Sequence, residues 1–223
     1  METAAERLGP LADEIVFLGG CATGLLLTDP GAPVVRATQD VDVISELTTM
    51  IEYHRFAEKL RQRGFQEDQG EDAVICRWRA DKVILDVMPT SPKVFGFGNE
   101  WYKPALDAAE SVSLPSGARI RMVTTPYFLA TKLAAFEGRG HGDYMASHDM
   151  EDILAVLDGR AEVTGEVQQS SEPLKQHLAQ RFRALLTERD FMDALPGHLP
   201  GDDASQARLP ILIRRLETLA ELA

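Results

Sequence analysis

Hydrophobic and polar residues alternate differently in the two halves of the chain. Up to about residue 123, short runs rich in β-branched and aromatic residues stand between Gly- and Pro-containing breaks, which is typical of strands and turns. The expected strands are 14–18, 41–44, 74–79 and 82–88, with short ones around Val112 and Ile120. Ala80-Asp81 separates the runs 74–79 and 82–88, so the sequence predicts an antiparallel hairpin there.

Helical spacing of apolar residues dominates from Thr125 onward. The expected helices are 3–13, 22–27, 49–63, 126–136, 148–157, 173–188 and 206–222. In helix 49–63, Ile51, Phe56 and Leu60 lie near one face and Gly64 ends the helix. This order predicts an α/β (α+β) fold, in which a mixed sheet flanked by helices is followed by a helical C-terminal region. We expect residues 1–123 to form the first part and residues 124–223 the second.

Composition and charge narrow the protein class. The 223 residues contain no apolar run of 18, and the first ten lack the apolar core of a signal peptide, so we expect a cytoplasmic protein without membrane contact. Cys21 and Cys76 form no CxxC pair, which favours packing roles over a zinc site. The net charge of −12 argues against tight non-specific nucleic-acid binding, although a local basic patch stays possible.

Three carboxylates fall in or beside the predicted strands. Asp40 and Asp42 are two residues apart, so a strand points both side chains to one face. Asp86 lies in the otherwise apolar run 83–88, where a carboxylate is costly to bury unless it is paired or binds a metal. Mg²⁺ prefers such oxygen ligands together with substrate phosphates. The alternative is ordinary: an exposed strand face for the first two acids and a strand end for the third.

Gly19 and Gly20 separate strand 14–18 from the helix that follows. Glycine lets the backbone approach a ligand closely, and a helix N-terminus offers free N–H groups to a phosphate. The same pattern can be only a tight turn. Combined with the three acids, it supplies the second half of a nucleotide site.

These features together resemble the DNA polymerase β-like nucleotidyltransferase superfamily. The shared elements are the turn Leu18-Gly19-Gly20, the acid-x-acid strand Asp40-Val41-Asp42-Val43, and Asp86 on a later strand. The run 36–42, Arg-Ala-Thr-Gln-Asp-Val-Asp, is similar to the Arg-x-Ser/Thr-x-Asp-x-Asp form of AbiEii/AbiGii-type and MenT-type toxins. Those families also carry a helical lysine and a later Asp-x-x-Asp, matched here by Lys132 and by the run 149–152. The resemblance covers roughly residues 14–158.

The resemblance implies a role for each matching residue. The implied metal ligands for Mg²⁺ (or Mn²⁺) are Asp40, Asp42 and Asp86. The implied nucleotide-binding residues are Gly19, Gly20, Arg36, Thr38 and Lys132. Catalytic roles are implied for the three acids and for Lys132, Asp149 and Asp152, so that the helical region 124–223 would complete the active site of the core 1–123.

Several of these residues can also be explained by helix structure alone, without a catalytic role. Lys132 shares a helix face with Leu129, Leu133 and Phe136, where it either extends its ammonium to water or enters a site. Asp149 and Asp152 stand in the first turn of a helix that Ser147 can cap, which alone would explain them.

The basic residues near these motifs are also ambiguous. Arg139 resembles a basic position of the toxin families. Arg77 and Arg79 share one strand face, which is either solvated or a path for an acidic acceptor.

The implied reaction is transfer of a nucleoside monophosphate from an NTP to an acceptor. The toxin families imply tRNA as the acceptor and an antitoxin protein as a partner. Transfer to a protein or a small molecule is the alternative among enzymes. A non-catalytic nucleotide-binding module of the same fold is the alternative outside them.

Overall fold

The computed structural model describes residues 1–70 and 73–223, and it confirms the predicted mixed α/β fold with a helical C-terminal region. The chain divides into two compact units. The sheet unit comprises Met1–Ala22 and Ala37–Thr124, and the helical unit comprises Thr23–Arg36 and Thr125–Ala223. Residues 23–36, which the sequence analysis grouped with the first half, thus make their contacts in the helical unit.

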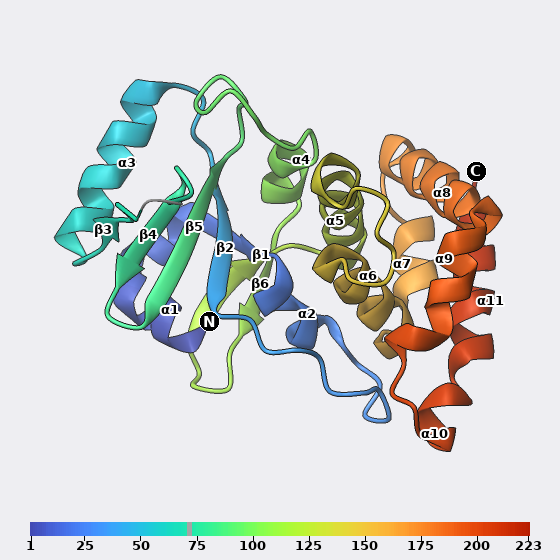
Figure 1. The fold of residues 1–223 in the computed structure, drawn as a ribbon. Helices are drawn as coiled ribbons and strands as arrows, with labels where there is room; N and C mark the ends of the chain where they lie inside the picture. The colour runs from blue at the N-terminus through green and yellow to red at the C-terminus, as the bar shows by residue number, and fades with distance from the viewer. Residues whose placement is uncertain (71–72) are drawn as a thin grey trace. The chain divides into compact units, whose positions relative to one another are not determined.

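A mixed seven-stranded sheet forms the centre of the sheet unit within the described residues (Figure 1). Its strand order is β3-β4-β5-β2-β1-β7-β6. The strands are β1 (Ile15–Leu18), β2 (Asp40–Ser45), β3 (Gln66–Glu67), β4 (Arg77–Ala80), β5 (Val83–Pro89), β6 (Glu110–Ser113) and β7 (Arg119–Met122). Strands β4 and β5 form the expected antiparallel hairpin, whereas β2 and β5 lie parallel to each other. The parallel pair brings together segments about 40 residues apart in sequence.

The two faces of this sheet differ in chemistry because side chains alternate along each strand. One face carries Trp78, Leu85 and Val43, all of which are fully buried. The other face carries the charged residues of these largely apolar strands, among them Asp42 and Asp86. The alternation therefore separates a packed face from an acidic one.

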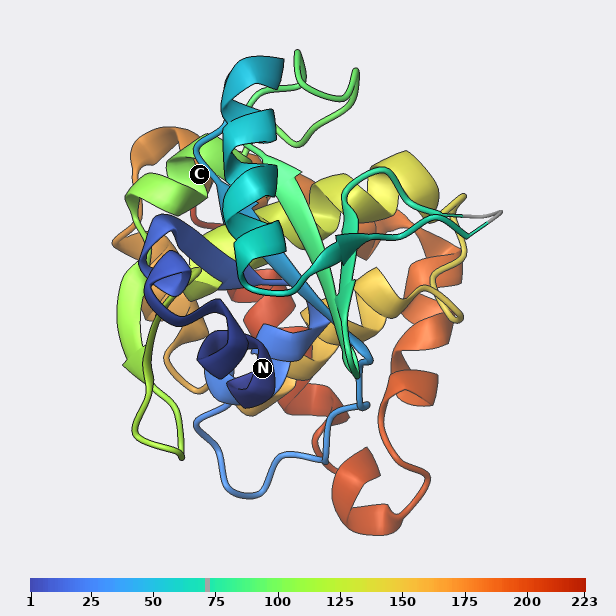
Figure 2. The same ribbon diagram turned by 90° about the vertical axis from the view of Figure 1, so that its left-hand side faces the viewer.

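Helix α3 (Met50–Gln62) lies against the apolar face, as Figure 2 shows, with the Arg61 guanidinium 5.6 Å from the centre of the Trp78 ring. Thr49 and Glu52 form a capping box at its start. Its buried residues include Phe56 and Leu60 as expected, but Ile51 is 65% exposed, and the buried stripe begins at Tyr53 instead. The other helical segments that begin before residue 124 are α1 (Glu2–Leu8), η1 (Gly9–Glu14), α2 (Gly20–Leu26) and α4 (Tyr102–Asp107).

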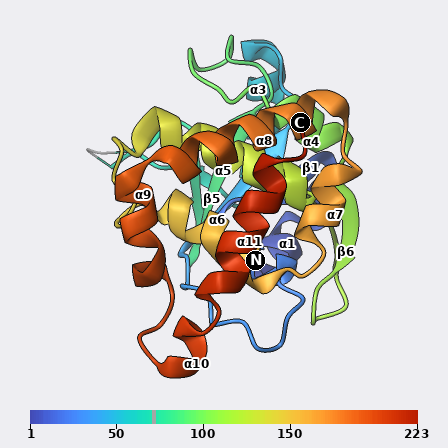
Figure 3. The same cartoon turned by 90° about the vertical axis from the view of Figure 1, so that its right-hand side faces the viewer.

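The helical unit is built around α5 (Thr125–Arg139), α6 (His148–Gly159), α8 (Glu172–Thr187) and α11 (Leu209–Ala220). Shorter segments connect them: α7 (Val163–Gln168), α9 (Arg189–Ala194), η2 (Leu195–His198) and α10 (Asp203–Gln206). Helices α8 and α11 pack side by side (Figure 3). Fully buried side chains from the four long helices form its core: Phe128, Leu129, Ile153, Leu157, Leu178, Phe182, Leu212 and Leu216.

The expected helix 206–222 is confirmed as α11, but it begins three residues later, at Leu209, after the separate short helix α10 ends at Gln206. Pro210 lies in the first turn of α11, a position where its missing N–H costs no hydrogen bond, so the chain restarts a helix there. Within the part of the chain that the structure describes, no helix is long and apolar enough to cross a membrane.

Candidate functional site

The register of β2 and β5 places the three predicted acids on one face of the sheet. Asp42 lies opposite Asp86 on the parallel neighbour, and Asp40 lies one pleat away on the same side. The Asp40 side chain is 42% exposed and the Asp86 side chain 10% exposed. Two adjacent strands therefore present Asp40, Asp42 and Asp86 together, with one of them largely buried.

Gly19 makes room for the middle acid. Its φ of +74° is a conformation that residues with a side chain rarely adopt. A Cβ at Gly19 would overlap the carboxylate of Asp42, which lies directly against the glycine backbone. Sequence reasoning assigned Gly19 to phosphate binding, and the structure adds this second reason for a glycine at the position.

Cys21 lies next to the same carboxylate. Its thiol donates a hydrogen bond to the Leu18 carbonyl oxygen at 3.1 Å. Burial, and after it the negative charge of Asp42, raises the pKa of Cys21 to about 12. The residue is therefore a neutral packing thiol, as the sequence suggested.

Arg77 joins the acidic face from β4. It lies opposite Asp86 in the hairpin register, and its guanidinium donates to both Asp86 oxygens, from Nε at 2.8 Å and from Nη2 at 2.6 Å. The same Nη2 reaches Asp40 Oδ2 at 3.3 Å. The hydrogen bonds to Asp86 raise the pKa of Arg77 above its ordinary value. Arg79, two residues on, pairs with Asp68 at 2.9 Å instead.

The acidic face fits a divalent ion only in part. Mg²⁺ is often held by one or two carboxylates plus substrate phosphates, which matches the chemistry of Asp40 and Asp42. Asp86 differs, since both its oxygens already accept hydrogen bonds from Arg77. Among residues 1–70 and 73–223, no three His, Cys, Asp or Glu side chains converge into a metal-binding group.

The helical unit holds the second set of predicted residues in a buried ion network. Lys132 of α5 places its ammonium 3.0 Å from Asp149 Oδ1 and 2.7 Å from Asp152 Oδ2, both on α6. Arg139 donates two hydrogen bonds to Asp149, of 2.8 and 2.9 Å. Arg36 reaches Asp152 at 3.0 Å. Each of the two acids therefore has two cationic partners.

Burial and charge act in opposite directions on this network. Burial alone would lower the pKa of Lys132, but the carboxylates of Asp152 and Asp149 outweigh it and raise that pKa. Burial would raise the pKa of Asp149, but the hydrogen bonds from Arg139 and the charge of Lys132 lower it. Lys132 is only 7% exposed, so the alternative in which its ammonium extends to water is wrong.

The remaining predicted residues lie close to these two sets. Thr38 donates its hydroxyl hydrogen to the Asp40 carbonyl oxygen at 3.2 Å, next to the acidic face. Ser147 caps α6 as expected, accepting from the Met150 N–H at 3.4 Å. Asp149 therefore has both a place in the first helical turn and a partner in Lys132. Sequence reasoning missed the pairing of Arg77 with Asp86, although the shared strand face of Arg77 and Arg79 was visible.

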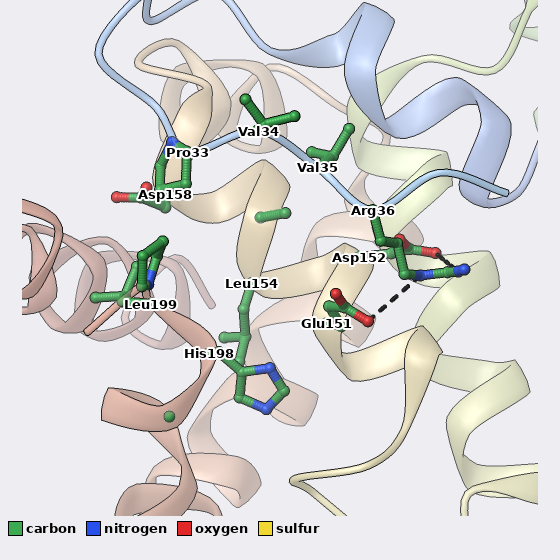
Figure 4. Close-up of a pocket in the computed structure, with 13 residues that line it drawn as sticks. Pro33, Val34, Val35, Arg36, Glu151, Asp152, Leu154, Asp158, His198 and Leu199 are labelled. Carbon is green, nitrogen blue, oxygen red and sulfur yellow. Dashed lines mark hydrogen bonds and ion pairs between the residues drawn. The ribbon is translucent and has the colours of Figure 1, made fainter. Parts of the chain in front are cut away.

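A cavity of about 250 Å³ lies within the helical unit, between the extended segment 33–36, one face of α6, and residues 197–200 (Figure 4). Arg36 lies at its edge and pairs there with Glu151 and Asp152. His198 on the far side is fixed by a contact of 2.7 Å between Nε2 and the Tyr144 carbonyl oxygen. Because its acidic groups have cationic partners, the cavity is nearly charge-balanced.

No protein-family model matches the chain, and no curated protein matches it. Among solved structures, a candidate nucleotidyltransferase from H. pylori shares 13% identity at a TM-score of 0.49, over 99% of this chain and 93% of its own. The structure of JHP933 from Helicobacter pylori shares 12% identity at a TM-score of 0.45, over 99% of this chain and 90% of its own. Similarities this distant do not assign an activity, so the function must be inferred from the residues of the chain itself.

Proposed function

We propose that this protein is a metal-dependent nucleotidyltransferase, which transfers a nucleoside monophosphate from an NTP to an acceptor. One observation carries the proposal. Asp40, Asp42 and Asp86 lie on one face of two adjacent parallel strands, and Gly19 gives Asp42 the space it needs. Three acids gathered on one strand face repel one another, and a bound divalent cation would offset that repulsion.

The reaction requires both charge neutralisation and proton removal. An acceptor hydroxyl attacks the α-phosphorus, the bond from that phosphorus to the bridging oxygen breaks, and pyrophosphate leaves with the electron pair. Asp40 and Asp42 are the proposed ligands of Mg²⁺, with Asp86 as the third carboxylate of the face. When bound, the ion neutralises charge on the phosphate oxygens in the transition state. Asp86 is the proposed acceptor of the hydroxyl proton.

Further nucleotide contacts are proposed from the resemblance to the toxin families. Backbone N–H groups of Gly19 and Gly20 and the hydroxyl of Thr38 would contact phosphates. Lys132 and Arg36 are proposed as phosphate-binding cations, and Asp149 and Asp152 as the residues that orient Lys132. The buried pairs at 3.0 and 2.7 Å support the orienting role, because they fix the position of the ammonium.

The acceptor we propose is tRNA, with the protein acting as the toxin of a toxin–antitoxin pair. A protein or a small molecule is the alternative acceptor, and the net charge of −12 favours it over RNA. A non-catalytic nucleotide-binding module is the second candidate function. The pairing of Asp86 with Arg77 favours it, because that pairing removes one acid from the set available to metal.

A transfer assay separates these possibilities. The protein is incubated with Mg²⁺ and each of the four α-labelled NTPs, in the presence of total tRNA, cell-extract protein or a small-molecule fraction. Asp42→Asn is the test variant. Asp81→Asn is the matched control, because it makes the same change at an exposed position of the sheet unit. Label on one acceptor, lost only in Asp42→Asn, is expected. Binding of NTP without transfer to any acceptor would favour the non-catalytic module.

A further inference from the structure

The acidic face contains its own cation. Arg77 is held on β4, yet its guanidinium reaches over β5 to Asp40 on β2, as the strand order β4-β5-β2 requires. Its side chain is 22% exposed and that of Asp86 is 10% exposed, so this ion pair is largely shielded from water. A bidentate arginine–carboxylate pair of this kind is stronger and more directional than an ordinary surface pair.

The pairing determines which carboxylate oxygens a metal can use. Arg77 takes both Asp86 oxygens at 2.8 and 2.6 Å, but it touches only one Asp40 oxygen, at the longer distance of 3.3 Å. A metal ligand must direct an oxygen lone pair at the ion. Asp86 therefore offers an ion only the remaining lone pair of each oxygen and shares its charge with Arg77, whereas Asp40 keeps one oxygen clear of the arginine.

We infer that Arg77 competes with divalent metal for Asp86, and so sets how tightly the acidic face binds its ion. This inference rests on the proposed function and adds a residue that determines metal affinity. A first ion is held through Asp40 and Asp42 while Arg77 retains Asp86. Asp86 becomes a full third ligand when the arginine releases it. Arg77 is thus a positioning residue that acts through Asp86.

The neighbouring arginine provides a control for this inference. Arg79 lies two residues further on the same strand and the same face, and its partner is Asp68. Substituting Arg79 removes the same charge from the same strand without freeing Asp86. A difference between variants of Arg77 and Arg79 therefore reports on the pairing and not on net charge.

The test is Mn²⁺ binding to the full chain, measured from the loss of the free-ion signal in electron paramagnetic resonance. Mn²⁺ suits the same hard oxygen ligands as Mg²⁺. Arg77→Met is expected to tighten Mn²⁺ binding by about tenfold, because it frees the Asp86 carboxylate to act as a ligand. Arg79→Met is expected to leave the affinity within about twofold of the wild type.

A double variant identifies the route of the effect. In Arg77→Met/Asp86→Asn the gain is expected to disappear, because the freed ligand is gone. Arg77→Lys keeps the charge but cannot form the bidentate pair with Asp86, so it is expected to give a smaller gain in Mn²⁺ affinity. It also provides a second variant to measure if Arg77→Met does not fold. Circular dichroism checks the fold of each variant.

The failures are distinguishable. Equal affinities in the wild type and Arg77→Met, or a gain that persists in the double variant, would overturn the role of Arg77 while leaving a metal site in place. An absence of Mn²⁺ binding in the wild type and in every folded variant would overturn the proposed metal site itself, and the inference with it.

Discussion

Replacing Lys132 with methionine tests whether the buried ion network stabilises the helical unit. Methionine keeps most of the apolar stem and removes the ammonium. Asp149 and Asp152 then remain buried, with side chains 5% and 2% exposed, and each loses one of its partners. Removing one member of a buried ion pair typically costs about 3–5 kcal/mol. Because Arg139 and Arg36 still serve the two acids, we expect the low end, about 3 kcal/mol.

Arg139→Met is the matched comparison. Arg139 makes two short hydrogen bonds to Asp149, yet its side chain is 71% exposed, and solvent screens a charge in that position. Its loss should therefore cost about 1 kcal/mol or less. Both substitutions remove a positive charge from Asp149, but only Lys132 is buried and also contacts Asp152, so the difference measures what burial and the second contact add.

Urea unfolding followed by far-UV circular dichroism is the assay, because the helical unit supplies most of the helix. Both tryptophans, Trp78 and Trp101, lie in the sheet unit, so their fluorescence reports on the other half of the chain. With a urea dependence of about 2 kcal/mol per M, Lys132→Met should lower the midpoint by about 1.5 M. A shift no larger than that of Arg139→Met would refute the account of a buried, stabilising lysine.

Three further predictions follow from the local geometry. Gly19→Ala should cost about 1–2 kcal/mol from its positive φ alone, and should weaken Mn²⁺ binding because the new methyl group displaces Asp42; unchanged binding would contradict this. The thiols of Cys21 and Cys76, each with a pKa raised to about 12, should resist a thiol reagent in the native protein and react once urea unfolds it. The lowered pKa of Asp149 stabilises the fold at neutral pH, and this contribution is lost as pH falls below 3.8 toward the folded-state value. The stability difference between wild type and Asp149→Asn should therefore shrink in acid, and a constant difference would count against the pairing.

The local part of the acidic face could be predicted from the sequence. A period of two places Asp40 and Asp42 on one side of any strand, and the structure confirms it. The position of Asp86 opposite Asp42 could not be derived in this way. It depends on the pairing of β2 with β5, which is decided by long-range packing and not by local pattern.

The Arg77–Asp86 pair was hidden by a small error in the hairpin turn. The sequence placed the turn at Ala80-Asp81, a register that sets Arg77 opposite Ile84. In the structure Ala80 pairs with Val83, and Asp81 takes a positive φ of 50° in the turn. That shift of two residues keeps Arg77 on the same face but moves it opposite Asp86.

The ion network around Lys132 could likewise be predicted only in its local part. Spacing along the helix correctly placed Lys132 among apolar neighbours, because this follows from the period of the helix alone. Its partners lie on a different helix, and the packing of α5 on α6 brings them within 3.0 Å. The segment 23–36 likewise joins the helical unit through contacts such as the hydrogen bond from Thr28 N–H to the Gly159 carbonyl oxygen at 2.9 Å.

The most direct test of the central claim is Mg²⁺-dependent NTP binding by isothermal titration calorimetry, with Asp42→Asn beside Asp81→Asn. If the acidic strand face holds the ion and the triphosphate, the wild type and Asp81→Asn will bind NTP only when Mg²⁺ is present, and Asp42→Asn will lose that binding while remaining folded. Equal binding by Asp42→Asn and the wild type, or no binding by the wild type to any of the four NTPs, would contradict the claim.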